Sequence, residues 1–210
     1  MNYKQVLEFW FGPLQQGIAD EKHQRLWFHA SAEDDADIKK HFAGALPKAV
    51  AGELDHWKQT PQGRLAMIIL LDQFPRHIFR GSALAFTYDA AALAVAREGI
   101  EQGDDKKLRI IARQFFYIPF QHSESPEDQQ QSLQLFSQMV EDAPDETLKT
   151  LAEYCLVYAR QHHDLIKLYG RFPHRNKALG RTSSKAEEQY LATGGSHFGQ
   201  GSEPAAGDND

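Results

Sequence analysis

Apolar residues recur at intervals of three or four positions along most of the chain, which is the spacing of amphipathic helices. No segment keeps the strict alternation of apolar and polar residues that a half-buried strand shows, and hairpin pairs such as Asn-Gly are absent from the sequence. The pattern therefore predicts an all-α fold of antiparallel helical hairpins, arranged as an α-α superhelix or as an irregular bundle. No repeat of fixed period decides between these two arrangements.

The longest apolar run, residues 65–71, is apolar on all sides and predicts a central, fully buried helix. Thr60 is a good N-cap and Pro61 suits the first helical position, so the helix is expected to cover residues 62–73. The run is far shorter than the roughly 20 apolar residues that span a bilayer. We expect no transmembrane helix and no membrane partner.

Capping residues and helix breakers divide the rest of the chain into further helices. The longest carries an apolar stripe that includes Cys155 and His162, which are therefore expected to be buried. The predicted helices run from Thr87 to Gly103, from Asp104 to Pro119, from Ser125 to Met139, from Pro144-Asp145-Glu146 to Gly170, and onward from Ser184, with Glu187 completing a capping box.

A chain of 210 residues suits one domain, which we place at residues 1–193. The rest, residues 194–210, has almost nothing to bury and is expected to form a flexible tail with Phe198 as its one anchor candidate. The single Cys155 has no partner for a disulfide, and the N-terminus lacks the layout of a signal peptide. A reducing, cytoplasmic location is therefore expected.

The net charge of −6 argues against a protein that holds nucleic acid by bulk electrostatics. Residues 160–185 are an exception, because seven basic residues face Asp164 alone and seven minus one leaves a local excess of six. RNA at this basic segment is a weak alternative, and nucleic acid is not the expected partner.

Four segments of the sequence resemble the bacterial domain of unknown function family 924. In chain order they are Phe9-Trp10-Phe11-Gly12, then Asp72-Gln73-Phe74-Pro75-Arg76-His77-Ile78-Phe79-Arg80-Gly81, then Phe115-Phe116-Tyr117-Ile118-Pro119-Phe120-Gln121-His122-Ser123-Glu124, and Gly170-Arg171-Phe172-Pro173-His174-Arg175-Asn176. The resemblance implies a fold similar to the tetratricopeptide-like helical superfamily and implies no reaction. His77 and Gln121 depart from the family pattern, whereas His163 falls where the family has a histidine.

The long motifs place arginine, histidine and aromatic residues around prolines at expected helix ends. A buried guanidinium needs a carboxylate, backbone carbonyls or a bound anion. Six arginines (Arg76, Arg80, Arg113, Arg171, Arg175 and Arg181) stand against Asp72 and Glu124, so six minus two predicts four unpaired positive charges if the segments converge. Arginines that bind the last carbonyls of a helix are the structural alternative.

The leading hypothesis is a pocket that binds a small phosphate- or carboxylate-bearing anion. It would form where residues 72–80, 121–124 and 170–181 converge. Arg80, Arg171 and Arg175 would clamp the anion, and His122, Glu124 and His174 would transfer protons if chemistry occurs. The other expected ligand-binding residues are Asp72, Arg76, Arg113, His163, Asn176 and Arg181.

Two further functions remain open alongside the anion site. A helical scaffold would bind a protein or peptide in an exposed apolar groove. A metal-dependent hydrolase would use His122, Glu124, His163 and His174, but this spacing is a weak signal and no residue is assigned as a metal ligand. The sequence assigns no cofactor and does not decide whether the protein is an enzyme.

Overall fold

The computed structural model describes residues 1–198, and in this range the chain is helical apart from its connecting turns. Apart from an isolated bridge between Gln15 and Ile18, these residues form no β pairing. The all-α prediction is confirmed. Most of the expected tail, residues 199–210, lies outside the described residues.

The first helices are α1 (Tyr3–Phe11), α2 (Glu21–Phe28), α3 (Ala32–Phe42) and the short α4 (Leu46–Val50). Gly12 ends α1 with a φ of 57°, which favours glycine. A Cβ atom at this position would lie 2.2 Å from the His23 ring. The glycine of the Phe-Trp-Phe-Gly motif is therefore required by both the backbone conformation and the packing of α2.

The central helix is longer than the sequence predicts. It begins at Pro61 with Thr60 as its N-cap, as expected, and runs as α5 (Pro61–Ile68), a π-helical turn (Ile69–Gln73) and α6 (Phe74–Ile78). Pro75 does not stop the helix, because the wider π turn precedes it and the proline falls in the first turn of the next α-helical segment. The predicted end at residue 73 is wrong, and the second motif lies within the helix.

The next two helices also differ from the predicted limits. Helix α7 (Asp89–Glu101) begins after Tyr88 rather than at Thr87, whose hydroxyl points back to the Ala83 carbonyl. Helix α8 (Ile110–His122) begins after Arg109 rather than at Asp104 and continues through Pro119. As in the central helix, a proline that reads as a stop is accommodated inside the helix.

The C-terminal helices follow the capping signals closely. Ser125 caps α9 (Pro126–Glu141), and Asp145 caps α10 (Glu146–Tyr169), which ends at Gly170 in a left-handed conformation. Helix α11 (Lys185–Ala192) has the predicted capping box. Short 3₁₀ turns complete the fold at Ala43–Ala45, Asp55–Gln59, Ala83–Phe86, Asp105–Lys107 and Pro173–Arg175.

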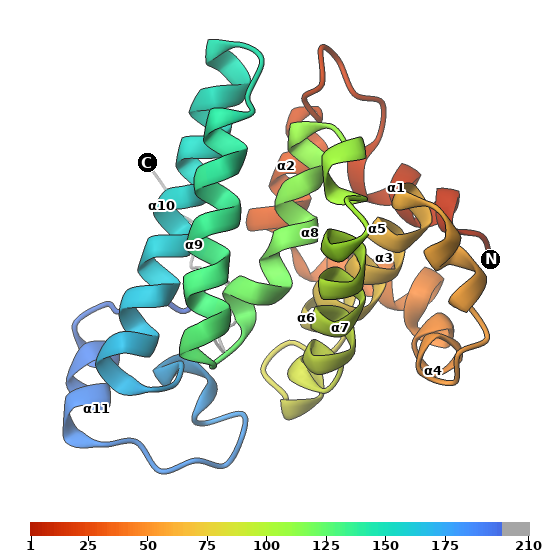
Figure 1. Ribbon diagram of the computed structural model, residues 1–210. Coiled ribbons are helices and arrows are strands. Elements are labelled where there is room, and N and C mark those ends of the chain that lie inside the picture. The colour runs from red at the N-terminus through yellow and green to blue at the C-terminus, as the bar shows by residue number, and fades with distance from the viewer. Residues whose placement is uncertain (199–210) are drawn as a thin grey trace, which may run out of the picture.

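Helix α8 joins the two halves of the molecule. It packs against α5 and α7 on one side and against α9 and α10 on the other. Figure 1 shows the long α9 and α10 upright beside α8, with the helices of the N-terminal half on the opposite side. Among the described residues, no helix is both long and apolar enough to cross a membrane.

The aromatic residues of the first three motifs pack together in the core. The Trp10 ring lies 5.6 Å from the Phe74 ring and 5.4 Å from the Phe115 ring, measured between centroids. The Trp27 indole donates a hydrogen bond of 2.8 Å to the Trp10 carbonyl. This packing holds the second and third motifs, which supply much of the cavity described next, in fixed positions.

Candidate functional site

A cavity of about 360 Å³ lies between the central helix, α8 and α10. The remaining wall comes from the end of α2, from Phe136 of α9 and from Ser196 and Phe198 near the end of the described chain. Aromatic rings form one part of the wall, among them Trp27 and Tyr158. The cavity is thus assembled from segments that lie far apart in the sequence.

The polar part of the wall is rich in nitrogen. Among the described residues that line the cavity, two are arginines, four are histidines and none is an aspartate or glutamate. The lining arginines, histidines and glutamines are Gln73, Arg76, His77, Arg80, Gln114, Gln121, His122 and His162, together with His29 at the end of α2. Of the predicted site residues, Arg76, Arg80 and His122 therefore line the cavity.

Asp72 and His122 form a buried pair, in which His122 lines the cavity and Asp72 does not. The His122 Nδ1 atom lies 2.9 and 3.0 Å from the two Asp72 carboxylate oxygens, and the Gln73 amide donates a further hydrogen bond of 2.6 Å. Burial opposes the charged carboxylate, but Arg76 and His122 outweigh this effect and hold the pKa of Asp72 below its usual value. Asp72 is therefore ionised and accepts the Nδ1 proton of His122.

His122 is neutral at physiological pH in this environment. Burial and the nearby charge of Arg76 lower its pKa, and together they exceed the opposite effect of Asp72. A neutral ring that donates from Nδ1 has an unprotonated Nε2 atom. It can accept a proton there, and the imidazolium that forms would be stabilised by the Asp72 carboxylate.

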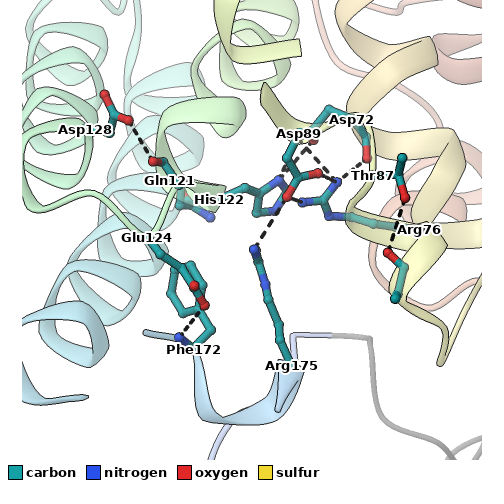
Figure 2. Close-up of polar contacts among 12 residues, drawn as sticks. Asp72, Arg76, Thr87, Asp89, Gln121, His122, Glu124, Asp128, Phe172 and Arg175 are labelled. Carbon is teal, nitrogen blue, oxygen red and sulfur yellow. Dashed lines mark hydrogen bonds and ion pairs between the residues drawn. The ribbon is translucent and has the colours of Figure 1, made fainter. Parts of the chain in front are cut away.

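Arg76 connects this pair to a second carboxylate, Asp89. One Arg76 nitrogen lies 3.4 Å from Asp72, and the guanidinium makes two 3.0 Å contacts to Asp89. Arg175 reaches the same Asp89 at 3.4 Å. Figure 2 shows Arg76 between the two carboxylates, with Arg175 approaching Asp89 from the 170–181 segment.

Arg175 lies behind the cavity wall rather than in it. Its guanidinium packs over the rings of Phe86 and Phe172, at 4.7 and 4.5 Å from their centroids. Its Nε atom is enclosed and has no hydrogen-bond partner among the described residues. Burial and the charge of Arg76 lower the pKa of Arg175 to about 10, so the group stays charged at neutral pH.

Arg80 is paired with Asp35 of α3. Its Nε and terminal nitrogen donate hydrogen bonds of 2.7 and 2.8 Å to the two carboxylate oxygens. Asp35 also holds His77, whose Nδ1 lies 2.8 Å away. The pair lies at the cavity wall with its cationic member among the lining residues.

The predicted excess of four positive charges is wrong. Each of the six arginines meets a carboxylate, because distant segments supply Asp35, Asp89, Asp142 and Glu187 in addition to Asp72 and Glu124. A clamp of three unpaired guanidinium groups therefore does not form. What remains is an asymmetry of position, since Arg76 and Arg80 reach the cavity wall and the carboxylates that bind them do not.

Glu124 is occupied by structural contacts. It accepts two hydrogen bonds from Arg181, of 2.7 and 3.0 Å, and one of 2.8 Å from the Phe172 backbone. Burial works against the charged form, but these donors hold the pKa of Glu124 below its usual value. The carboxylate thus fastens the 170–181 loop to the end of α8 and does not line the cavity.

His174 lies beside the cavity but outside its wall. Its ring packs against Phe172 and Phe198, and its Nδ1 atom is enclosed without a hydrogen-bond partner among the described residues. Burial and the neighbouring Arg175 charge lower the pKa of His174 to about 2. The ring is therefore a neutral packing element at neutral pH.

The other predicted ligand-binding residues are placed away from the cavity. Arg113 binds Asp142 at 2.6 Å, and Arg171 makes two hydrogen bonds of 2.6 and 2.7 Å to Glu187 of α11. His163 contacts Asp164 on the outside of α10, and Asn176 contacts Ser183 and Arg181 within the loop.

No group of three histidine, cysteine, aspartate or glutamate side chains is arranged to hold a metal ion within residues 1–198. His122, Glu124, His163 and His174 therefore do not form the ligand set that the metal hypothesis required. Cys155 lines the cavity, and its thiol donates to the Gln114 side chain at 3.3 Å. Burial raises the pKa of Cys155 to about 12, so the thiol is not a ready nucleophile.

The sequence did not identify three residues that shape the site. Asp35 and Asp89 lie in the first turns of α3 and α7, and only the fold brings them to Arg80 and Arg76. His162 was expected to be buried on the α10 stripe, and it is, but the cavity opens on its ring. A histidine on a stripe otherwise made of apolar residues was the available signal.

The comparisons with known proteins add family relationships to this geometry. The profile of the family described as "Bacterial protein of unknown function (DUF924)" matches residues 6–195. The solved structure of the protein of unknown function ATU0120 from Agrobacterium tumefaciens is similar, with a TM-score of 0.78 and 33% sequence identity over 91% of this chain and 97% of that chain. No curated protein matches the sequence.

Proposed function

Because this chain belongs to the bacterial DUF924 family, whose description assigns no function, we propose from its own site that it binds a small anionic molecule in the cavity beside His122. The observation that supports this function is the composition of the wall. Arg76 and Arg80 line the cavity, and none of the described lining residues is acidic. A cavity whose walls place cations nearer than their counter-ions has a positive potential, which attracts anions.

The size of the cavity favours a small metabolite. Small-molecule sites usually occupy roughly 300–1,000 Å³, and this cavity of about 360 Å³ is near the lower limit. The mixed wall also suits a small polar ligand, because aromatic rings supply contact area and the amides of Gln73, Gln114 and Gln121 can donate or accept hydrogen bonds.

If the ligand reacts, His122 is the proton-transfer residue of choice. It lines the cavity, it is oriented by Asp72, and its Nε2 atom is unprotonated. Glu124 and His174 do not share these properties, because the first is held by Arg181 and the second lies outside the wall. The proposal therefore assigns acid–base chemistry to His122 alone, with Asp72 as its positioning partner.

A thermal-shift screen with small phosphates and carboxylates tests the binding function. A ligand at 100 times its dissociation constant stabilises the protein by about 2.7 kcal/mol, which is readily measured. Arg80→Gln should reduce the response to the active compounds at least several-fold. Arg171→Gln is the matched control, because it also breaks a bidentate ion pair but lies away from the cavity. The Arg171 side chain is 31% exposed and that of Arg80 is 29% exposed.

Two outcomes would count against anion binding. One is that no phosphate or carboxylate stabilises the protein, and the other is that Arg80→Gln and Arg171→Gln weaken the response equally. The second outcome would mean that the response reports general charge screening rather than binding in the cavity.

A second candidate function, a helical scaffold for a protein or peptide, is supported by the outer face of α10. Val157 and Leu168 are 46% and 72% exposed there, and large apolar side chains exposed along one helix can form a docking surface. A stoichiometric partner that is lost in Leu168→Glu and retained in Arg80→Gln would favour the scaffold over the anion site.

A further inference from the structure

Two histidine rings of the cavity wall, His122 and His162, are held by hydrogen-bond acceptors at the same ring position. The Nδ1 atom of His122 contacts the Asp72 carboxylate, and the Nδ1 atom of His162 lies 2.8 Å from the Tyr158 carbonyl oxygen. A carbonyl oxygen and an ionised carboxylate can only accept hydrogen bonds. Both histidines therefore carry their proton on Nδ1.

The protonation of Nδ1 fixes the character of the opposite nitrogen. In a neutral imidazole the second nitrogen, Nε2, is an acceptor with an available lone pair. Burial lowers the pKa of both rings, and that of His162 falls well below its ordinary value. Both side chains thus present acceptors rather than donors.

Both Nε2 atoms are open to the cavity. Neither Nε2 atom has a hydrogen-bond partner among the described residues. Neither atom is fully enclosed by these residues, so a ligand can reach both. The two rings line the same cavity, with their centroids 6.1 Å apart. The two rings are therefore close enough for one ligand to contact both.

An anionic group alone does not complement these two nitrogens. Carboxylate and phosphate oxygens are acceptors, so they suit Arg76 and Arg80 but not two imidazole lone pairs. A hydroxyl group donates a hydrogen bond and fits the histidine side. An ammonium group also donates, but its positive charge would lie near Arg76 in a cavity whose described wall has no carboxylate to balance it.

We propose that the ligand is a hydroxylated anion, with a carboxylate or phosphate toward Arg76 and Arg80 and a hydroxyl group that donates to Nε2 of His122 or His162. This inference rests on the proposed anion-binding function and specifies its substrate class. In this arrangement the two histidines determine specificity. They accept a hydrogen bond from a hydroxyl group, whereas a deoxy analogue leaves their Nε2 atoms without a donor.

Isothermal titration with compounds that differ in one group tests the inference. The carboxylate series are propionate, lactate and alanine, and succinate, malate and aspartate; the phosphate pair is n-propyl phosphate and 2-hydroxypropyl phosphate. In at least one series the hydroxylated compound should bind about tenfold more tightly than its deoxy analogue, and the amino compound should bind more weakly than the hydroxylated one.

The variant His162→Leu should remove most of this discrimination. Leucine has a similar volume and no hydrogen-bond acceptor. The Tyr158 backbone carbonyl loses the hydrogen bond from His162 Nδ1 but keeps its place in the helix. The ratio of the two affinities should fall from about tenfold to about twofold, while the affinity for the deoxy compound is retained. His174→Leu is the matched control, because this buried neighbour lies off the cavity wall and its loss should leave the ratio unchanged.

The outcomes separate this inference from the function on which it rests. Equal affinity for deoxy and hydroxylated anions, or tighter binding of the amino compounds, overturns the substrate class and leaves anion binding intact. Failure of every anion to bind overturns both.

A measurement without a variant gives an independent check. Two-bond ¹H–¹⁵N spectra of the imidazole rings distinguish the two tautomers, and His122 and His162 should both be protonated at Nδ1. A proton on Nε2 of either ring in the free protein would overturn the acceptor arrangement, whether or not His162→Leu folds.

Discussion

His122 and His162 show how buried histidines link the site to the stability of the protein. Burial is the main cause that lowers the pKa values of His77, His122, His162 and His174 below the ordinary 6.5. Below pH 6.5 the unfolded chain therefore binds protons that the folded chain does not. The folded state is favoured above that pH and loses stability as the pH falls.

We expect the free energy of unfolding to decrease from pH 7 to pH 5. His174 alone, with a pKa of about 2 in the folded state, should contribute up to about 2 kcal/mol of this decrease. Urea unfolding of the wild type and of His174→Leu at both pH values measures its share. The variant should show a smaller difference between the two pH values, and an unchanged difference would refute the assignment.

Arg76 is the residue whose loss should cost most at the site. Its removal leaves the completely buried Asp72 carboxylate without its arginine partner. It also removes two of the contacts that bind Asp89. Removing one member of a buried ion pair typically costs about 3–5 kcal/mol, so Arg76→Gln should lower the free energy of unfolding by this amount.

Arg25 provides the contrast for this experiment. It pairs with Asp34 at 3.2 Å, but its side chain is 48% exposed, so Arg25→Gln should cost less than about 1 kcal/mol. Equal losses for the two variants in urea unfolding would show that the buried network does not behave as an interdependent unit.

At the scale of elements, glycines control how closely the helices approach. Gly99 of α7 faces α5 and α8, where an added Cβ would lie 2.3 Å from the Arg64 side chain and 2.4 Å from the Phe116 ring. Gly99→Ala should destabilise the fold by about 1–3 kcal/mol, despite the better helix propensity of alanine.

Gly44 is the control for this substitution. It lies in a 3₁₀ turn with nothing within 4 Å of an added Cβ, so Gly44→Ala should be neutral or slightly stabilising. Thermal unfolding of both variants measures the difference. Similar midpoints would contradict the close approach of α7 to its neighbours.

The sequence predicts helix starts correctly where a side chain caps the helix, and it misses the starts of α7 and α8, which have no side-chain cap. Thr60, Ser125, Asp145 and Ser184 cap their helices as expected, because an N-cap is a local hydrogen bond between neighbouring residues. The two predicted stops at residue 73 and Pro119 fail because a π turn and the surrounding core stabilise a helix through a proline. Local signals do not contain that tertiary contribution.

At the scale of the whole molecule, the pairing of charges could not be predicted from the sequence. Arg80 and Asp35 are 45 positions apart, and Arg175 and Asp89 are 86 positions apart. Residues of the 72–80 and 121–124 segments meet at the cavity, whereas no residue of 170–181 lines it, and the fold that positions these arginines also supplies their carboxylates. The candidate site is consequently a network of paired charges in which Arg76 and Arg80 reach the cavity wall.

The convergence of the motifs also explains why they are recognisable as a set. The first three share one aromatic cluster, and the fourth is fastened to the third through Glu124, Phe172 and Arg181. Much of the resemblance to the family therefore reflects packing around the cavity rather than chemistry alone.

The most direct test of the central claim is an NMR titration of the ¹⁵N-labelled protein with inorganic phosphate, lactate and malate. Binding in the cavity predicts saturable shifts of the Gln73 to Arg80 backbone signals and of the His122 and His162 ring signals. Shifts confined to the exposed basic residues of segment 160–185, or none at millimolar concentrations, would contradict the assignment of the cavity as an anion site.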